Sequence, residues 1–406
     1  VHAMSAPRMT YRRLPARELG VTLIEMMVVM GIGLILTLAI FLVLSASEGR
    51  KRTTTSVNDT AQAGGYGMYV IDKMLRSSGS GFAQSGTFAY GCTLFAQKGT
   101  TQILPAANAL PAPFAAVNTG TAGLFRLAPV LIAPGQTTPN VSGAASDVLV
   151  VMGGSAGFGE YPVTFRGLPT SGSTNALDLP NTLSFRGDDL VMLAEEFNSN
   201  CMIQQVQSGF AGGTANALPL AGTYAAGTIG SASLVGYSVS GTVMNMGNAA
   251  NGNPPTILLV GVGDNNTLFS YNLLQTDVDA GGNPVQMPLA DGVFEMHALY
   301  GVDPTNSGTV TWVSPSSAGY SLAALMAGTQ TAAGLLQSIK AVRVGIITRT
   351  SLRERDPVSP SALTLFSDLA DSAGNALTYT RTLTTAEQNF RYRTIESTIP
   401  IRNNLN

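Results

Sequence analysis

The sequence predicts an α+β protein, with one long N-terminal helix followed by a large, mostly antiparallel β region. Three observations lead to this prediction. The run Val21–Leu44 contains 24 residues and only one charge. Apolar residues then recur at helical spacing to about residue 76. Beyond residue 81, short runs of β-forming residues alternate with clusters of Gly, Pro, Asn and Ser, and no regular βα alternation is visible.

The apolar run follows a basic leader, residues 1–20, which ends in Gly20. Its arginines are Arg8, Arg12, Arg13 and Arg17. At a rise of about 1.5 Å per residue, a helix over 21–44 is long enough to span a bilayer. A plain signal anchor also fits this length, whereas a secretory signal peptide has a shorter apolar region and a small-residue cleavage site after it. Glu25 argues against a plain anchor, because a carboxylate inside lipid is costly and indicates a functional site.

The segment Gly20–Val28 reads Gly-Val-Thr-Leu-Ile-Glu-Met-Met-Val and resembles the cleavage motif of type IV prepilins. The resemblance implies that a prepilin peptidase cuts between Gly20 and Val21, and that the new amino group of Val21 is N-methylated. It also implies that Glu25 meets the terminal amine of a neighbouring subunit. This agrees with the physical expectation that a buried carboxylate becomes tolerable when it is paired with an ammonium group. Val21 departs from the family, which usually has Phe there.

The orientation of the membrane segment depends on the same resemblance. Basic residues lie on both sides of it, since Arg50, Lys51 and Arg52 follow the span, so the positive-inside rule barely decides. The prepilin resemblance places the leader inside. It therefore implies a single-pass inner-membrane protein with a periplasmic C-terminus, which later enters a pilus or reaches the cell surface.

Residues 45–80 are predicted to continue the helix in amphipathic form. Met68, Ile71 and Leu75 recur on one face, which could pack on a sheet. The glycines at 64, 65 and 67 are poor helix formers and predict a weak point or bend. The sequence Ser77-Ser78-Gly79-Ser80-Gly81 predicts the end of the helix.

Residues 81–406 are predicted to form a periplasmic, β-rich globular domain. A second helix is expected over Ser321–Ile339, and the Gly/Ala/Ser/Thr/Asn-rich residues 207–255 are expected to form long loops or irregular strands. The candidate strands are Asp147–Met152, Leu190–Leu193, Met202–Val206, Thr256–Val262, Leu268–Leu273, Val293–Tyr300, Thr309–Val313 and Val342–Thr348.

Charge and cysteine content bear on compartment and partners. Only 11% of residues are charged, which is typical of an extracellular rather than a cytosolic chain. No Lys or Arg occurs between Arg186 and Lys340, a stretch with ten acidic residues; it is either a solvated acidic surface or an interface for a basic partner subunit. Cys92 and Cys201 both follow the apolar segment, and an oxidising periplasm favours a disulfide between them, although two unpaired thiols stay an alternative.

The C-terminal half resembles minor pilins of the PilW class. The resemblance rests on Tyr300-Gly301-Val302-Asp303, Ala341-Val342-Arg343-Val344 and the final Arg402-Asn403, and Cys92 and Cys201 lie where that class tends to carry cysteines. It implies a minor pilin that primes or caps assembly of a type IV pilus. The implied partners are other minor pilins, the major pilin, the prepilin peptidase and the inner-membrane assembly platform, with a large tip adhesin as a further candidate.

Three other functions stay open at the level of sequence. The PilW class resembles the GspJ pseudopilins of type II secretion, so the two machines are hard to separate from one chain. A pilus-tip adhesin that binds ligands through the loop-rich middle is a second alternative. The third is a membrane-anchored periplasmic hydrolase, since Gly153–Gly157 matches G-x-S-x-G with Ser155 as its nucleophile. The last is disfavoured, because no helix is predicted to follow and His297 is the only downstream histidine.

No catalytic residue, metal or cofactor is expected, and no nucleic acid. Asp277–Asn283 is similar to the start of a calcium loop, but Pro288 stands where the loop needs an acidic residue. Asp303–Gly308 is a second acidic turn with too few carboxylates. At both turns an ordinary Asx turn is favoured, and a bound ion stays the alternative. Two cysteines and one usable histidine make zinc improbable, and no P-loop or basic patch with interleaved aromatics occurs.

Overall fold

The computed structural model describes residues 20–85, 89–106, 109–117, 123–137, 145–156, 161–172, 174–196 and 198–404. The chain forms two compact units, residues 1–55 and 56–406. The second part of the long helix therefore belongs to the same compact unit as the β region. The leader arginines and Gly157 lie outside the described residues.

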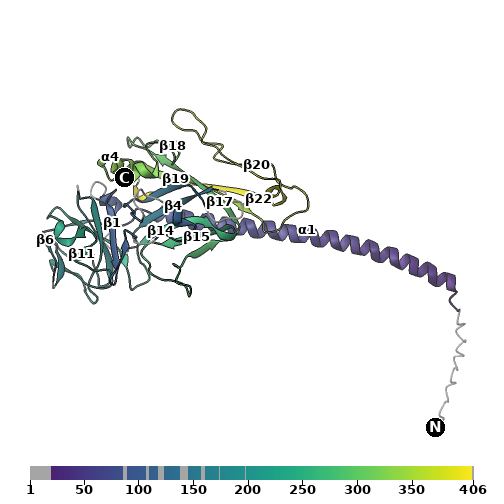
Figure 1. Ribbon diagram of the computed structural model, residues 1–406, viewed down its shortest axis with the longest axis horizontal. Helices are drawn as coiled ribbons and strands as arrows, with labels where there is room; N and C mark the ends of the chain where they lie inside the picture. The colour runs from purple at the N-terminus through teal and green to yellow at the C-terminus, as the bar shows by residue number, and fades with distance from the viewer. Residues whose placement is uncertain are drawn as a thin grey trace, which may run out of the picture. The chain divides into compact units, whose positions relative to one another are not determined.

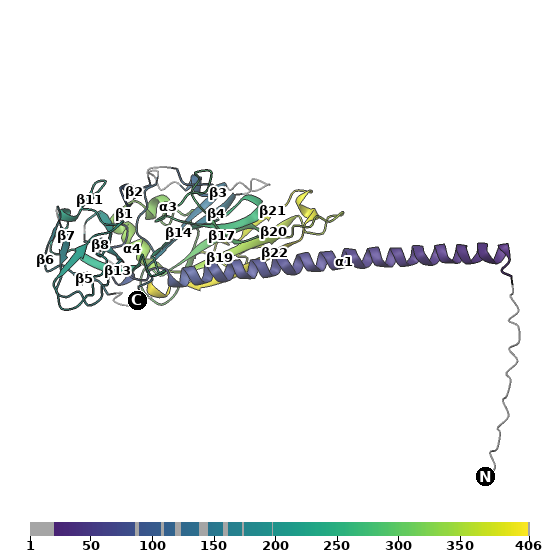
Figure 2. The ribbon, with the colours of Figure 1, turned by 90° about the horizontal axis from the view of Figure 1, so that it is seen from below.

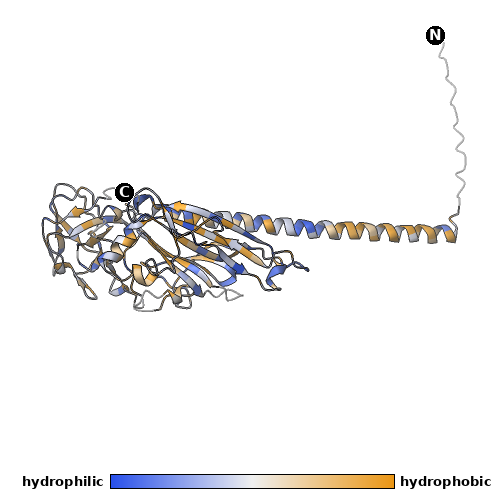
Figure 3. Cartoon of the chain, turned by 90° about the horizontal axis from the view of Figure 1, so that it is seen from above, coloured by the Kyte–Doolittle hydropathy of each residue, from blue (hydrophilic) through white to orange (hydrophobic). Residues whose placement is uncertain are grey.

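The predicted long helix is α1, Leu23–Ser77, and the α+β fold class is confirmed. Thr22 precedes the helix, and its Oγ1 accepts a hydrogen bond from the backbone N–H of Glu25 at 3.3 Å, which satisfies one of the free donors of the first turn. The helix ends at Ser77 as predicted, and Gly79 follows with a φ of 79°. The residues of α1 up to Leu44 are almost all apolar (Figure 3).

Two glycines of α1, Gly64 and Gly67, lie where the helix meets a sheet. The helix runs unbroken through residues 64–67. A Cβ atom at Gly64 would lie 2.7 Å from Cγ2 of Thr348 and 2.8 Å from Cδ1 of Ile395, and one at Gly67 would lie 3.1 Å from Cβ of Ala290. Intrinsic propensity predicted a weak point here. The structure shows instead that the missing side chains let the helix backbone approach the sheet closely.

Three sheets make up most of the globular unit (Figure 1). Neighbouring strands pair antiparallel throughout, except that β1 and β9 run parallel. The six-stranded sheet has the order β2 (Thr101–Leu104), β1 (Thr93–Lys98), β9 (Asn200–Gln205), β8 (Asp189–Ala194), β13 (Thr242–Asn248), β5 (Val163–Thr164). The five-stranded sheet has the order β16 (Met287–Ala290), β15 (Thr267–Asn272), β14 (Thr256–Gly263), β4 (Ala145–Gly153), β3 (Val130–Thr137). The four-stranded sheet has the order β18 (Thr311–Val313), β17 (Val293–Val302), β19 (Ile339–Arg349), β22 (Tyr392–Pro400).

Smaller elements complete the unit. The minor sheets are β10 (Ala217–Leu220) with β7 (Asn175–Asp178) and β6 (Gly167–Thr170), β11 (Thr228–Ile229) with β12 (Ala232–Ser233), and β20 (Ala362–Leu365) with β21 (Tyr379–Thr382). The short helices are α3 (Leu322–Leu325) and α4 (Gln330–Ser338), with single 3-10 turns at Ala83–Ser85, Phe114–Ala116, Leu234–Gly236, Asp264–Asn266, Glu387–Asn389 and Arg402–Asn404.

The predicted apolar face of α1 enters the main core. Met68, Ile71 and Leu75 are buried there together with residues of all three large sheets. The four-stranded sheet lies between α1 and the β20–β21 hairpin, because side chains of β19 alternate between the two: Thr348 contacts Gly64, whereas Ile347 packs against residues of the hairpin (Figures 1 and 2). The amphipathic pattern therefore positions the helix on this sheet.

Two local predictions need correction. All eight candidate strands overlap strands of the structure, but residues 207–255 also contain β13, Thr242–Asn248, which is buried along its whole length. This strand was not predicted because its Gly and Asn residues have low strand propensity. The single helix expected over Ser321–Ile339 is two helices, because Gly328 adopts a φ of 69° between them and Thr329 caps α4.

The close approach at Gly64 gives a test of this packing. Gly64→Leu should lower the free energy of unfolding by about 2 kcal/mol or more, because the new side chain overpacks the contact with Thr348. Gly65→Leu is the matched control: Gly65 has no neighbouring heavy atom within 4 Å, and this change should stabilise by up to about 1 kcal/mol through helix propensity. Urea titration followed by fluorescence of Trp312, the one tryptophan, measures both. Equal effects of the two substitutions would contradict the packing.

Candidate functional site

The first part of α1 presents apolar side chains on every side. Each large apolar residue from Val21 to Leu44 is exposed, for example Leu23 at 79% and Phe41 at 73%. A helix that is apolar all round is stable only inside a membrane or a bundle. Among the described residues, α1 is the one helix that is long and apolar enough to cross a membrane.

The predicted processing residues lie at the start of this helix. Gly20 and Val21 precede it and are exposed, and no heavy atom of another residue would lie within 4 Å of a Cβ at Gly20. Glu25 lies in the first turn of α1, where its negative charge complements the helix dipole. Its carboxylate contacts no cation among the described residues. The arrangement offers an accessible peptide bond just before an apolar helix and, within the described part of the chain, an unpaired carboxylate in the first turn of that helix.

The structure joins Cys92 and Cys201 in a disulfide, with Cα atoms 5.6 Å apart. Both cysteines are buried. Cys92 directly precedes β1, and Cys201 lies in β9, the strand that pairs in parallel with β1. The bridge therefore fastens the one parallel strand pair, which belongs to two segments 109 residues apart in sequence.

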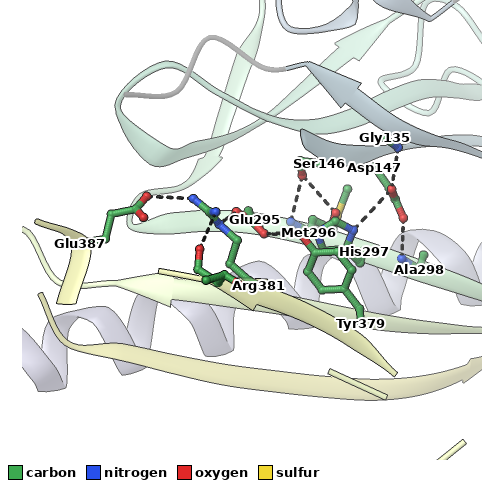
Figure 4. Close-up of polar contacts among 11 residues, drawn as sticks. Gly135, Ser146, Asp147, Glu295, Met296, His297, Ala298, Tyr379, Arg381 and Glu387 are labelled. Atoms are coloured by element: carbon green, nitrogen blue, oxygen red, sulfur yellow. Dashed lines mark hydrogen bonds and ion pairs between the residues drawn. The ribbon is translucent and has the colours of Figure 1, made fainter. Parts of the chain in front are cut away.

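A buried ionic cluster was missed in the sequence (Figure 4). Glu295 of β17 is fully buried, and its Oε1 lies 2.6 Å from Nε of Arg381. The oxygen lies off the line of the N–H, so the contact is an ion pair rather than a hydrogen bond. Arg381 also contacts Glu387 at 2.8 Å, and the hydroxyl of Tyr379 donates to Oε2 of Glu295 at 2.9 Å.

His297 lies in the same cluster, between two carboxylates. Its Nδ1 is 3.5 Å from Oδ1 of Asp147, its Nε2 is 3.4 Å from Oε2 of Glu295, and its ring stacks on Tyr379 with centroids 3.7 Å apart. Burial lowers the pKa of His297, but the hydrogen bonds and charges of Asp147 and Glu295 raise it more, so the pKa lies at about 9. His297 is therefore a cation at neutral pH. Two polar residues at alternate positions of an otherwise apolar strand were the available sequence signal.

The contacts of Ser155 give no support to the hydrolase alternative. Its Oγ donates to the backbone carbonyls of Asn253 and Pro254. Both ring nitrogens of His297 face carboxylates. A nucleophilic serine needs a base within hydrogen-bond reach, and neither carbonyl can act as one.

The acidic turns are closed by their own backbone. Oδ1 of Asp279 accepts hydrogen bonds from the backbone N–H groups of Gly281 and Asn283. The carboxylate of Asp303 accepts from those of Ser307 and Gly308. These backbone hydrogen bonds hold the pKa of Asp279 and that of Asp303 below the usual value. Among the described residues, no group of three or more His, Cys, Asp or Glu side chains could hold a metal ion.

Two family models match the chain. Residues 15–41 match the prokaryotic N-terminal methylation motif. This match supports a type IV pilin-like protein, and together with the exposed apolar helix it supports anchoring in a membrane.

Residues 259–403 match PilW, the type IV pilus-assembly protein W. The match begins in β14 and includes the whole four-stranded sheet. The chain thus matches a type IV minor pilin of the PilW class, and both resemblances noted in the sequence are confirmed. No curated protein and no solved structure matches the chain. The family implies a structural role and interaction with other pilins and the pilus machinery.

The disulfide gives a second prediction. Replacing Cys92 and Cys201 together by Ser should lower the free energy of unfolding by about 4–5 kcal/mol, because the unfolded chain regains the entropy of a loop of about 100 residues. Urea titration of both proteins, with and without reductant, measures the difference. An unchanged midpoint for the native chain in reductant would contradict the stabilising role.

His297 gives a third prediction. The folded pKa of about 9 exceeds the unfolded value of about 6.5, so the protonated form stabilises the fold. This stabilisation is complete below pH 6.5 and is lost as the pH rises to about 9, with a total near 3 kcal/mol. His297→Gln should remove that slope, as measured by urea titration between pH 6 and 9.5. A variant that keeps the slope would show that another group titrates.

Proposed function

We propose that this chain is a minor pilin that primes or caps the assembly of a type IV pilus. The observation that carries the proposal is the apolar, exposed start of α1, which begins at Leu23, shortly after Gly20, and holds one carboxylate, Glu25, in its first turn. The matches to the methylation motif and to PilW support it.

Processing is the first step of the proposed pathway. The prepilin peptidase hydrolyses the peptide bond between Gly20 and Val21 and releases the leader. Both residues are exposed, so the bond is open to a membrane protease. The freed amino group of Val21 then becomes the N-methylation site, and it stays a cation after one methyl group is added.

Assembly is the second step. In lipid, Glu25 is an unpaired carboxylate in an apolar environment, which is costly. The terminal ammonium of a neighbouring subunit removes that cost by pairing with it, and the apolar side chains around the helix pack against other helices rather than lipid. The pair therefore favours transfer of the subunit from the membrane into the filament.

The proposed location follows from this pathway. Before assembly the protein is a single-pass inner-membrane protein with residues 56–406 in the periplasm, and the assembly platform moves it into the pilus. Its partners are other minor pilins and the major pilin, with a large tip adhesin as a further candidate. The size of the globular unit supports a place at the tip, where a bulky head does not have to fit into every repeat of the filament.

Substitution of Glu25 tests the proposal. Glu25→Gln should leave the chain cleaved and in the membrane but reduce its amount in sheared pili by at least about tenfold, because loss of one partner of a buried ion pair is strongly destabilising. Glu48→Gln, which removes a carboxylate from α1 beyond the apolar run, is the matched control. Quantitative immunoblots of membrane and pilus fractions measure both. Recovery of the native chain in a type II secretion filament rather than in pili would replace the proposal by the pseudopilin alternative.

A further inference from the structure

Residues 350–391, here called the strap, form a long excursion between β19 and β22. The backbone N–H of Thr350 donates to the carbonyl of Arg391 at 2.9 Å, and the N–H of Arg391 donates to Oγ1 of Thr350 at 3.2 Å. The strap therefore leaves the four-stranded sheet and returns to it at one point. Between these ends it contains the β20–β21 hairpin, which has its own backbone pairing.

The hairpin is attached to the sheet through side chains. No backbone–backbone hydrogen bond joins residues 361–386 to the described residues outside the strap. A small apolar cluster instead joins Phe294, Leu299 and Ile347 of the sheet to Leu365, Phe366 and Leu383 of the strap. At the surface, Arg343 of β19 contacts Asp368 at 3.2 Å.

The interface between strap and sheet is incompletely filled. A cavity of about 480 Å³ is lined by His297 and Leu299 of β17 and by Phe366, Leu377 and Tyr379 of the strap. The pocket is open, so the side chains that line it face solvent there instead of packing against other residues. The polar groups on its floor are already engaged with one another, since His297 faces Asp147 and Glu295. The cavity thus weakens the attachment of the strap rather than supplying free ligand-binding groups.

The buried part of the attachment is ionic. Glu295 is fully buried, and two of its three polar partners, Arg381 and Tyr379, belong to the strap. A buried ion pair gains little net stability over separated, hydrated ions, because desolvation offsets the Coulomb attraction. Opening the strap hydrates both Glu295 and Arg381, and that hydration compensates much of the lost contact.

We propose that the strap opens as one cooperative unit about its base at Thr350 and Arg391 while the rest of the globular unit stays folded, and that the Glu295–Arg381 pair is the latch that holds it closed. Such sub-global opening is expected where a segment has its own backbone pairing, none with its neighbours, and a single apolar cluster to hold it. The open form exposes the apolar face of β17 and the cluster around His297. The inference does not depend on the proposed function.

Hydrogen exchange of the full-length chain in detergent micelles, followed by mass spectrometry, tests the proposal. In the native protein, amides of β20 and β21 should exchange much faster than those of β14 and β17. The free energy of the opening that exposes them should depend little on urea concentration. Arg381→Met should speed exchange in the hairpin by about a hundredfold, because the buried Glu295 loses its 2.6 Å ion-pair partner and keeps only the more distant His297. Amides of β14 should change less than about twofold. Arg355→Met, at an exposed arginine of the strap, is the matched control and should change neither.

The double variant Glu295→Met/Arg381→Met separates the latch from simple loss of packing. It removes both partners of the latch together, with Glu387 alone losing its contact with Arg381, and should restore much of the slow exchange in the hairpin. Hairpin amides that exchange only together with β14 and β17 in the native protein would overturn the separate opening of the strap, even if a variant failed to fold. Unchanged hairpin exchange in Arg381→Met would overturn the role of the latch.

Discussion

The contact between α1 and the four-stranded sheet is the constraint on which the globular unit depends. Glycine at positions 64 and 67 brings the helix backbone so close to Thr348, Ile395 and Ala290 that no larger side chain fits without a shift. This approach places the apolar face of the helix in the main core, where residues of all three large sheets meet it. The same helix is apolar on every side in its first part and amphipathic in its second part, where only one face is apolar. One continuous helix therefore contains both the apolar segment suited to a membrane and the segment that packs in the main core.

Charge is scarce in this chain, and one buried cluster gathers several charged side chains. Only 11% of residues are charged, yet Glu295, Arg381, Glu387, His297 and Asp147 gather between β17 and the strap. An apolar interface of the same size would hold the strap more firmly, since desolvation offsets most of the attraction within a buried ion pair. The distribution of charge thus separates a rigid part, built on the helix and the large sheets, from a part that can open.

The N-terminal features were predictable from sequence because they depend on local order. A leader that ends in Gly20, an apolar run and a single carboxylate at Glu25 can be recognised without knowing the fold. The end of the helix at Ser77 and the eight candidate strands were predictable for the same reason. The strand β13 was not, because its Gly and Asn residues have low strand propensity and only burial between β8 and β5 holds them in a sheet. The ionic cluster was not predictable either, since Glu295 and Tyr379 are 84 residues apart and meet only after folding.

We infer that the exposed apolar helix is that of a processed pilin. The intact mass of the membrane-extracted chain is a direct test of this processing. The measurement is made in cells with and without the prepilin peptidase. We expect the chain to lose residues 1–20 and to gain one methyl group, and to do so only when the peptidase is present. A chain that stays uncleaved in both strains, or is cut at another bond by a general signal peptidase, would contradict it.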